Sequence, residues 1–431
     1  MPLRYLTIDF NSFFASVEQQ ERPELRGKAV GIVPVMAETT GCVAISIEAK
    51  ARGLTRNARV ADARRLCPGI VIVEARPEVY INYQRRLVAA IETLVPETKV
   101  QSIDEVTAHL HAMLSRPEAE KLAKQIKAKI AREVGPLLRS SIGIAPTWLL
   151  AKVASDMQKP DGLVILDDGD IPGKLLHLQP GDIAGVGPNI QRRLGEHGIT
   201  TMAQLYAATK GEFRGVWGGV RGEQIWRLLH GEDLPYFEHE VGKTIGHGAV
   251  LPPAQRNHPD ALAVLHRLLQ KAAMRLRHAQ LYAGALSVSV DYTDDTSWAD
   301  LLQLTETQDT LRLTHALNDL WKKLPDKFSR RTPLRVGVHL TGLIDLKLHT
   351  PDLFEEPTEQ ARGKLFAAVD HLNKVLGKNT VYLGGAHGAT KDAPMRIAFT
   401  RIPEPEIEEI DRSYKGRLKK PQPPPPAPEA W

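Results

Sequence analysis

The chain has 431 residues, of which 42% are hydrophobic and 25% charged, an ordinary composition for about three globular domains. Its net charge of +5 is too small to indicate a nucleic-acid partner, and its two cysteines match neither a disulfide framework nor a zinc site. Because no apolar run reaches about 18 residues and Asp9 follows closely on the N-terminus, we expect no membrane span and no signal peptide, but a reduced, cytoplasmic protein.

The first 166 residues alternate between short strands and helices. We predict, in chain order, four strand–helix pairs at about residues 3–8, 11–18, 29–33, 77–94, 102–110, 117–134, 140–145 and 147–157. Apolar residues recur every four positions from Leu122 to Val134, which makes that helix the clearest. Pro146 is expected in the first turn of the helix that follows it. The alternation predicts an α+β domain that ends near residue 166.

The rest of the chain changes character twice. Residues 172–233 predict short helices broken by glycines, with little strand signal. From Lys243 the pattern predicts the order β-α-β-β-α-β, at about residues 244–250, 261–278, 286–292, 301–304, 307–324 and 334–340. An extension beyond residue 343 predicts a helix at 360–376 and a strand at 380–383. The basic and then proline-rich tail from residue 412 is expected to be disordered.

Three acids stand out in the first domain. Asp9 follows a buried-type strand, where capping the next helix is the alternative role, and Asp104 and Glu105 lie inside an apolar strand. Charges there are costly unless a cation compensates them, and carboxylate oxygens favour magnesium over zinc. Neighbouring strand residues point to opposite faces. Either the strand bends at this pair, therefore, or one acid, more readily Glu105, lies outside the metal site.

Several short sequence blocks are weak signals individually but specific when they occur together in this order. They are Ile8-Asp9-Phe10-Asn11-Ser12-Phe13-Phe14, Leu66-Cys67-Pro68, Ser102-Ile103-Asp104-Glu105, Ser141 to Pro146, Leu150 to Asp156, Lys159 to Leu163 and Ala184 to Pro188. Together they resemble the Y-family translesion DNA polymerases, most closely the DinB or polymerase IV branch, over about residues 1–345. The resemblance implies an α+β multidomain right hand. Its parts would be a palm at 1–166 with fingers inserted at about 19–76, a helix-hairpin-helix thumb at 167–236, a βαββαβ little finger at 242–345, an extension at 346–411 and a disordered tail at 412–431.

The resemblance also implies a catalytic site. Asp9, Asp104 and Glu105 would be catalytic and would bind two Mg²⁺ ions, with help from the Phe10 carbonyl. Such metals, about 3.5–4 Å apart, activate an attacking oxygen and stabilise a leaving pyrophosphate. The implied nucleotide-binding residues are Phe13, Phe14, Ala44, Ile47, Lys50 and Lys159. Phe14 falls at the family's steric gate, where its ring would clash with a ribose 2′-hydroxyl.

Plainer roles exist for some of these residues. Phe13 and Phe14 can be core side chains, and for Phe13 this is the better interpretation. Lys159 can be a solvated lysine at a helix end. The segment Ile47-Glu48-Ala49-Lys50 also departs from the Tyr-Glu-Ala-Arg of most members and resembles polymerase V catalytic subunits, as does Asn11. Because lysine cannot replace the bidentate contacts of arginine and isoleucine donates no hydrogen bond, the strength of nucleotide binding stays open.

Contacts with DNA are expected at glycine turns and basic residues, although ordinary turns and a solvated surface are the alternatives. The candidates are Gly185, Val186, Gly187, Gly219, Arg330, Arg331 and Arg335. Phosphate contacts of this kind give salt-dependent, sequence-independent affinity. Leu353 and Phe354 resemble the end of a peptide that binds the bacterial sliding clamp, and a loop anchored on its own core is the alternative.

These features predict a monomeric, error-prone, template-directed DNA polymerase that extends primer-template DNA with deoxynucleoside triphosphates past damage, in the cytoplasm and at the nucleoid. The alternative is a polymerase-like DNA-binding adaptor of a mutagenesis complex that has lost catalysis. The three acids favour the enzyme, while Ile47 and Lys50 keep the adaptor open. A helix-hairpin-helix nuclease would share the two-metal chemistry but would not explain the fingers-like block or the βαββαβ module.

Overall fold

The computed structural model describes residues 2–236, 244–349, 357–390, 397, 399, 402 and 403. The chain forms two compact units. The first contains Met1–Ile32, Gly41–Glu238 and Ala398–Ile402, and the second contains Val33–Thr40, His239–Ile397 and Pro403–Trp431. Within the described ranges, no helix combines the length and the apolar composition needed to cross a membrane.

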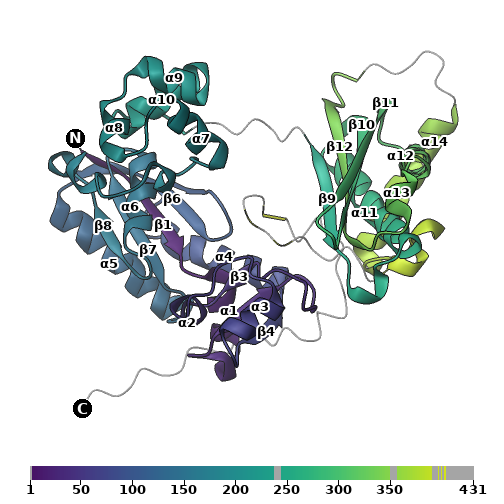
Figure 1. Cartoon of the computed structure of the whole chain (residues 1–431), viewed down its shortest axis with the longest axis horizontal. Coiled ribbons are helices and arrows are strands. Elements are labelled where there is room, and N and C mark those ends of the chain that lie inside the picture. The colour runs from purple at the N-terminus through teal and green to yellow at the C-terminus, as the bar shows by residue number, and fades with distance from the viewer. Residues whose placement is uncertain are drawn as a thin grey trace. The chain divides into compact units, whose positions relative to one another are not determined.

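A five-stranded sheet forms the centre of the first unit (Figure 1), in the order β5-β6-β1-β7-β8. Its strands are β1 (Leu3–Phe10), β5 (Thr98–Val100), β6 (Glu105–Leu114), β7 (Ser140–Ala145) and β8 (Leu163–Ile165). β1 pairs antiparallel with β6 on one edge and with β7 on the other. Its apolar residues are buried on both faces, as the continuous apolar run predicts. Asp9 pairs with Glu105 in this register, which brings two of the predicted acids together.

Helices α1 (Phe13–Glu21), α4 (Pro77–Glu92), α5 (Arg116–Glu133) and α6 (Trp148–Met157) belong to the same unit. The Thr147 hydroxyl accepts a hydrogen bond from the Leu150 N–H at 3.2 Å and caps α6. Pro146 therefore precedes the cap, and its predicted place in the first turn is wrong. α6 packs directly on β7 because Gly143 has no side chain: a Cβ there would lie 2.1 Å from the Ala151 carbonyl oxygen.

Two smaller substructures complete the first unit. A three-stranded sheet has the order β3-β2-β4, from β3 (Ala44–Ile45), β2 (Val30–Val33) and β4 (Val71–Glu74), and is accompanied by α2 (Ile47–Ala51) and α3 (Val60–Leu66). The short helices predicted for residues 172–233 are present as α7 (Pro188–Glu196), α8 (Met202–Ala207), α9 (Lys210–Trp217) and α10 (Gly219–Leu229). Gly218, at φ +86°, turns the chain between α9 and α10.

The second unit contains a four-stranded antiparallel sheet in the order β11-β10-β12-β9 (Figure 1). Its elements are β9 (Ile245–Val250), α11 (His258–His278), β10 (Leu281–Tyr292), β11 (Ser297–Thr307), α12 (Thr310–Lys322), α13 (Asp326–Ser329) and β12 (Pro333–Asp345). Apart from the short α13, this is the predicted β-α-β-β-α-β order. Val288 and Val338 are buried against the helices, whereas Arg335 and His339 alternate with the buried residues of β12 and are exposed.

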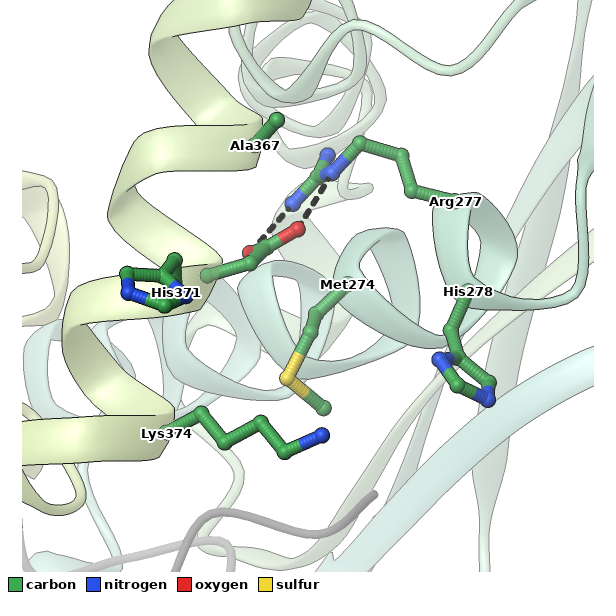
Figure 2. A pocket seen from close by; sticks show the side chains of 7 residues that line it. Met274, Arg277, His278, Ala367, His371 and Lys374 are labelled. Atoms are coloured by element: carbon green, nitrogen blue, oxygen red, sulfur yellow. Dashed lines mark hydrogen bonds and ion pairs between the residues drawn. The ribbon is translucent and has the colours of Figure 1, made fainter.

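The extension packs on the second unit through α14 (Pro357–Leu376) and a 3₁₀ helix, η6 (Gly384–Ala389). A pocket of about 270 Å³ lies between α11 and α14, and Figure 2 shows Arg277 of α11 paired with a carboxylate of α14 across it. That carboxylate belongs to Asp370, 2.7 Å from the Arg277 Nε. The pair ties the extension helix to the unit's longest helix.

The prediction of a strand at residues 380–383 is wrong. The backbone groups of this segment form hydrogen bonds with side-chain amides and not with a neighbouring strand. The Asn373 side chain donates to the Val381 carbonyl and accepts from its N–H, both at 2.9 Å. Gln270 accepts from the Leu383 N–H at 3.1 Å. The apolar pattern is that of a strand, but the backbone partners come from two helices. The predicted clamp-binding residues Leu353 and Phe354, and the tail from residue 412, lie outside the described residues.

A buried ion cluster fixes α1 against α4. Glu18 is 0% exposed, and its carboxylate accepts two hydrogen bonds from Arg76, at 2.8 and 2.6 Å, and one from the Tyr80 hydroxyl at 2.9 Å. Glu18→Ala removes a buried carboxylate together with these three hydrogen bonds, so we expect the free energy of unfolding to fall by about 3–5 kcal/mol in urea denaturation. Glu21→Ala, on the same helix, loses one bond to Tyr83 and should cost about 1 kcal/mol. Equal losses in the two variants would contradict this role for the cluster.

Candidate active site

The chain bends immediately before β6. Residues 102–104 are outside any strand and β6 begins at Glu105, so the strand is shorter than predicted at this end. The Ser102 hydroxyl donates to the Asp104 Oδ1 at 2.6 Å, and the Phe10 N–H donates to the Asp104 carbonyl at 2.8 Å. Strand alternation therefore does not fix the direction of the Asp104 side chain, because the bend that one of the two alternatives requires is present. Asp104 lines the pocket at the end of β1 and Glu105 does not.

A pocket of about 240 Å³ opens at the end of β1. The predicted residues that line it are Asp9, Phe10, Phe13, Phe14, Ala44, Lys50, Asp104 and Lys159. Ile47 begins α2 and is not among the lining residues. Arg56 and Phe399 line the pocket without having been predicted. For Arg56 the signal was the basic stretch that follows Lys50, whereas Phe399 carries no local signal.

Two lysines neutralise the acids. The Lys152 Nζ lies 2.8 Å from Asp9 and 2.9 Å from Glu105, and the Lys159 Nζ lies 2.7 Å from Asp9. Asp156, one turn after Lys152 on α6, contacts both ammonium groups, at 3.5 and 2.7 Å. The sequence analysis assigned no role to Lys152 or Asp156. The available signal was a lysine among the apolar residues of the first two turns of this helix.

The two lysines compensate the buried acids only in part, as the pKa shifts of these groups indicate. Burial raises the pKa of Asp104, and the negative charge of Asp9 raises it further. Burial likewise raises the pKa of Glu105, which Lys152 lowers. Although burial alone would lower it, the carboxylates of Asp9, Glu105 and Asp156 raise the pKa of Lys152 above its ordinary value. Desolvated carboxylates that repel one another stabilise a bound cation.

The donor set fits a hard divalent cation, because all its side-chain donors are carboxylate oxygens. In the described part of the chain, no three His, Cys, Asp or Glu side chains are already gathered as a metal site. Asp9 and Glu105 instead contact the Lys152 ammonium. A metal ion at these acids would take over the role of that ammonium.

Lys152→Met tests this exchange. Loss of the ammonium removes the cation paired with Glu105 and leaves Asp9 with Lys159 alone, so we expect a loss of about 2 kcal/mol, or roughly 4–8 °C in Tm, in the presence of EDTA. Mg²⁺ should then raise the Tm of the variant more than that of the wild type. Lys129→Met is the matched control, since Lys129 is 18% exposed against 19% for Lys152 and pairs with one acid, Glu133. Equal stabilisation of all three proteins by Mg²⁺ would contradict the exchange.

Phe13 and Phe14 line the pocket, and both are 3% exposed. The Phe14 ring stacks on Tyr80, with centroids 4.5 Å apart and an interplanar angle of 18°. Phe13 is tilted against Phe10 at 6.1 Å and against Phe14 at 5.9 Å. Each ring is thus a core side chain that also lines the pocket. Tyr80, held by Glu18, connects the ion cluster of α1 to the position of the Phe14 ring.

Three cations face the pocket from different elements. Lys50 lies on α2, Arg56 on the following loop and Lys159 after α6. Burial, followed by the like charge of Lys159, lowers the pKa of Lys50 below its ordinary value. The crowding of these charges favours a polyanion such as a triphosphate.

The predicted DNA-binding residues are distributed over both units. Gly187 caps α7, Gly185 has φ +88°, and Gly219, with φ +49°, begins α10. The Val186 side chain is buried in the core of these helices, so only its backbone can face a phosphate. In the second unit, Arg330 and Arg335 are exposed, whereas Arg331 pairs with Asp294 and donates to the Thr296 hydroxyl.

The fold and the pocket define the class of the protein. A chimera of the Y-family DNA polymerases Dbh and Dpo4 has the same fold, with a TM-score of 0.65 and 22% identity over 80% of this chain and 100% of that one. The chain therefore has the fold of the Y-family DNA polymerases, as predicted. Its DNA polymerase IV relatives of more than 30% identity confirm the predicted DNA-directed DNA polymerase activity.

Sequence comparison identifies the family. The impB/mucB/samB family matches residues 8–156, and its C-terminal domain matches residues 242–353, so the chain belongs to the impB/mucB/samB family. DNA polymerase IV of Moorella thermoacetica is 31% identical over 88% of this chain and 94% of that protein. DNA polymerase IV of Pelotomaculum thermopropionicum is 32% identical over 87% of this chain and 93% of that protein.

Proposed function

We propose that this polymerase extends primer-template DNA past damage, at low fidelity, by nucleotidyl transfer at Asp9, Asp104 and Glu105. The observation that carries the proposal is the convergence at the end of β1. Two of the acids line one pocket with Phe14, Lys50 and Lys159, and the third shares the Lys152 ammonium with Asp9. The adaptor alternative is not favoured, because all three acids are present and the relatives are polymerases.

The residues of the site divide into two functional groups. The three acids, with the Phe10 carbonyl, would hold two Mg²⁺ ions, which supply activation of the primer 3′ oxygen and stabilisation of the leaving pyrophosphate. Lys159, Lys50 and Arg56, which line the same pocket, would bind the triphosphate. Phe14 would lie under the sugar, and the small side chain of Ala44 would leave space for the base. Ile47, which departs from the family pattern, lines no part of this pocket.

We assign residues 1–166 to the palm, with fingers at 19–76, residues 167–236 to the thumb and residues 242–345 to the little finger. The glycine turns at Gly185 and Gly219 would contact DNA phosphates through backbone N–H groups, and the exposed Arg330 and Arg335 through their charges. We further propose that the enzyme works as a monomer at the bacterial nucleoid, and that Leu353 and Phe354 bind the sliding clamp.

Primer extension tests the function directly. With Mg²⁺ and all four deoxynucleoside triphosphates, the wild type should extend a primer on an undamaged template and on one that carries an abasic site. Omission of Mg²⁺ should stop both reactions, because the acids alone cannot activate the primer oxygen. If the protein adds no nucleotide to either template, the proposed mechanism is wrong. If it extends only the undamaged template, bypass of this lesion is excluded and the chemistry stands.

A further inference from the structure

Phe399 lies in the pocket with the residues proposed to bind the incoming nucleotide. Its ring is 5.7 Å from the Phe14 ring, and the Arg56 guanidinium lies 5.8 Å from its centroid. Residues 398–402 group with the first unit, although they follow the extension of the second unit in sequence. Phe399 is outside the two stretches, 8–156 and 242–353, that match the family. The contact is therefore not part of the matched polymerase core.

A backbone hydrogen bond anchors Phe399 beside the acids. Its carbonyl oxygen accepts from the Ile103 N–H at 2.8 Å, and Ile103, which is 1% exposed, immediately precedes Asp104. A buried N–H group needs an acceptor, so this bond gives Phe399 a defined place. The ring itself remains 42% exposed. A side chain that is anchored through its backbone but half-exposed can occupy the pocket and still be displaced from it.

We propose that Phe399 is an autoinhibitory plug, which the incoming nucleotide has to displace before Phe14 and Arg56 can contact it. The inference rests on the proposed assignment of this pocket to the nucleotide. A triphosphate on Lys50 and Lys159, with its reacting phosphate at Asp104, places its sugar at Phe14, where the Phe399 ring now lies. Both cannot occupy this space.

The charges of the pocket make the plug reversible. The Phe399 ring offers Arg56 only a cation–π contact and supplies no negative charge to Lys50 or Lys159. A nucleoside triphosphate neutralises all three cations, so it outcompetes the ring when its concentration is high. The plug therefore raises the nucleotide concentration at which the polymerase becomes active without changing the chemistry of the occupied site.

Steady-state primer extension with dATP opposite template thymine tests the plug in the full-length protein. If the plugged form is about 70–90% populated, removal of the ring raises apparent affinity about three- to tenfold. Phe399→Ala should lower the KM for dATP by this factor and leave kcat unchanged. Phe399→Leu, which keeps bulk but loses the aromatic face, should give an intermediate KM. Leu365→Ala, at a residue of α14 that is 54% exposed, should match the wild type.

Equilibrium binding of a non-hydrolysable dATP analogue distinguishes a failure of the plug from a failure of the proposed nucleotide site. Tighter binding to Phe399→Ala than to the wild type, by the factor seen in KM, supports the plug. If the wild type binds the analogue and extends primers, but Phe399→Ala has the same or a higher KM, the plug is overturned and the proposed function stands. If the wild type binds no analogue, the nucleotide assignment of the pocket fails and the plug fails with it.

Discussion

Asp104→Asn is expected to reduce the rate of nucleotide addition at least about a thousandfold, the upper range for loss of one preorganised electrostatic group. The amide keeps the shape of the side chain and can still contact the Ser102 hydroxyl, so the bend before β6 should persist. What is lost is the negative charge beside Asp9 that a divalent cation requires. Single-turnover primer extension with saturating nucleotide measures the effect on the chemical step.

The same substitution should leave the Tm unchanged or raise it. Burial raises the pKa of Asp104, so the folded protein disfavours the charged form, which is the form proposed to bind the metal ions. Asp62→Asn is the matched control: it makes the same chemical change at a half-exposed acid on α3, which pairs with Arg65, and should retain full activity. A loss of activity in Asp104→Asn that is accompanied by a large fall in Tm would indicate a structural role instead.

The sequence predicted this fold well where local patterns decide it. Three patterns can each be read within a few residues of sequence: the buried run of β1, the alternation in the strands of the βαββαβ module and the four-residue repeat of α5. Strand ends were less predictable. The bend at residues 102–104 depends on Ser102 and on the Phe10 N–H of a neighbouring strand, and the false strand at 380–383 depends on the amides of Gln270 and Asn373.

The grouping of the acids was predictable, because their residue type indicates their chemistry. Adjacent acids in an apolar strand indicate a cation, and these acids do converge with Asp9. Lys152 was missed because a lysine in a mostly apolar helix does not reveal which side chains it faces. Here it faces two acids on neighbouring strands that are about a hundred residues apart in sequence. Phe399 was missed because the chain path that returns it to the pocket, almost 300 residues after Asp104, leaves no local pattern.

Phe14→Ala is expected to lower the preference for deoxynucleotides over ribonucleotides by about a hundredfold or more, as judged by the ratio of kcat/KM for dATP and ATP. The Phe14 ring lines the pocket and stacks on Tyr80, whose hydroxyl donates a hydrogen bond to Glu18. This support prevents the ring from moving away from a bound sugar. A 2′-hydroxyl above such a rigid ring clashes, whereas a methyl group leaves room for it.

Phe13→Ala is the control that separates this role from packing. Phe13 is adjacent on α1, is equally buried at 3% exposure and lines the same pocket, so both truncations should cost about 3–5 kcal/mol of stability. Since Phe13 packs on Phe10 and lacks the Tyr80 support, only Phe14→Ala should change the sugar preference. An equal change in sugar preference in both variants would mean that looser packing around the pocket, and not a clash with the Phe14 ring, determines the preference for deoxynucleotides. An unchanged ratio in Phe14→Ala would remove the ring from the gate altogether.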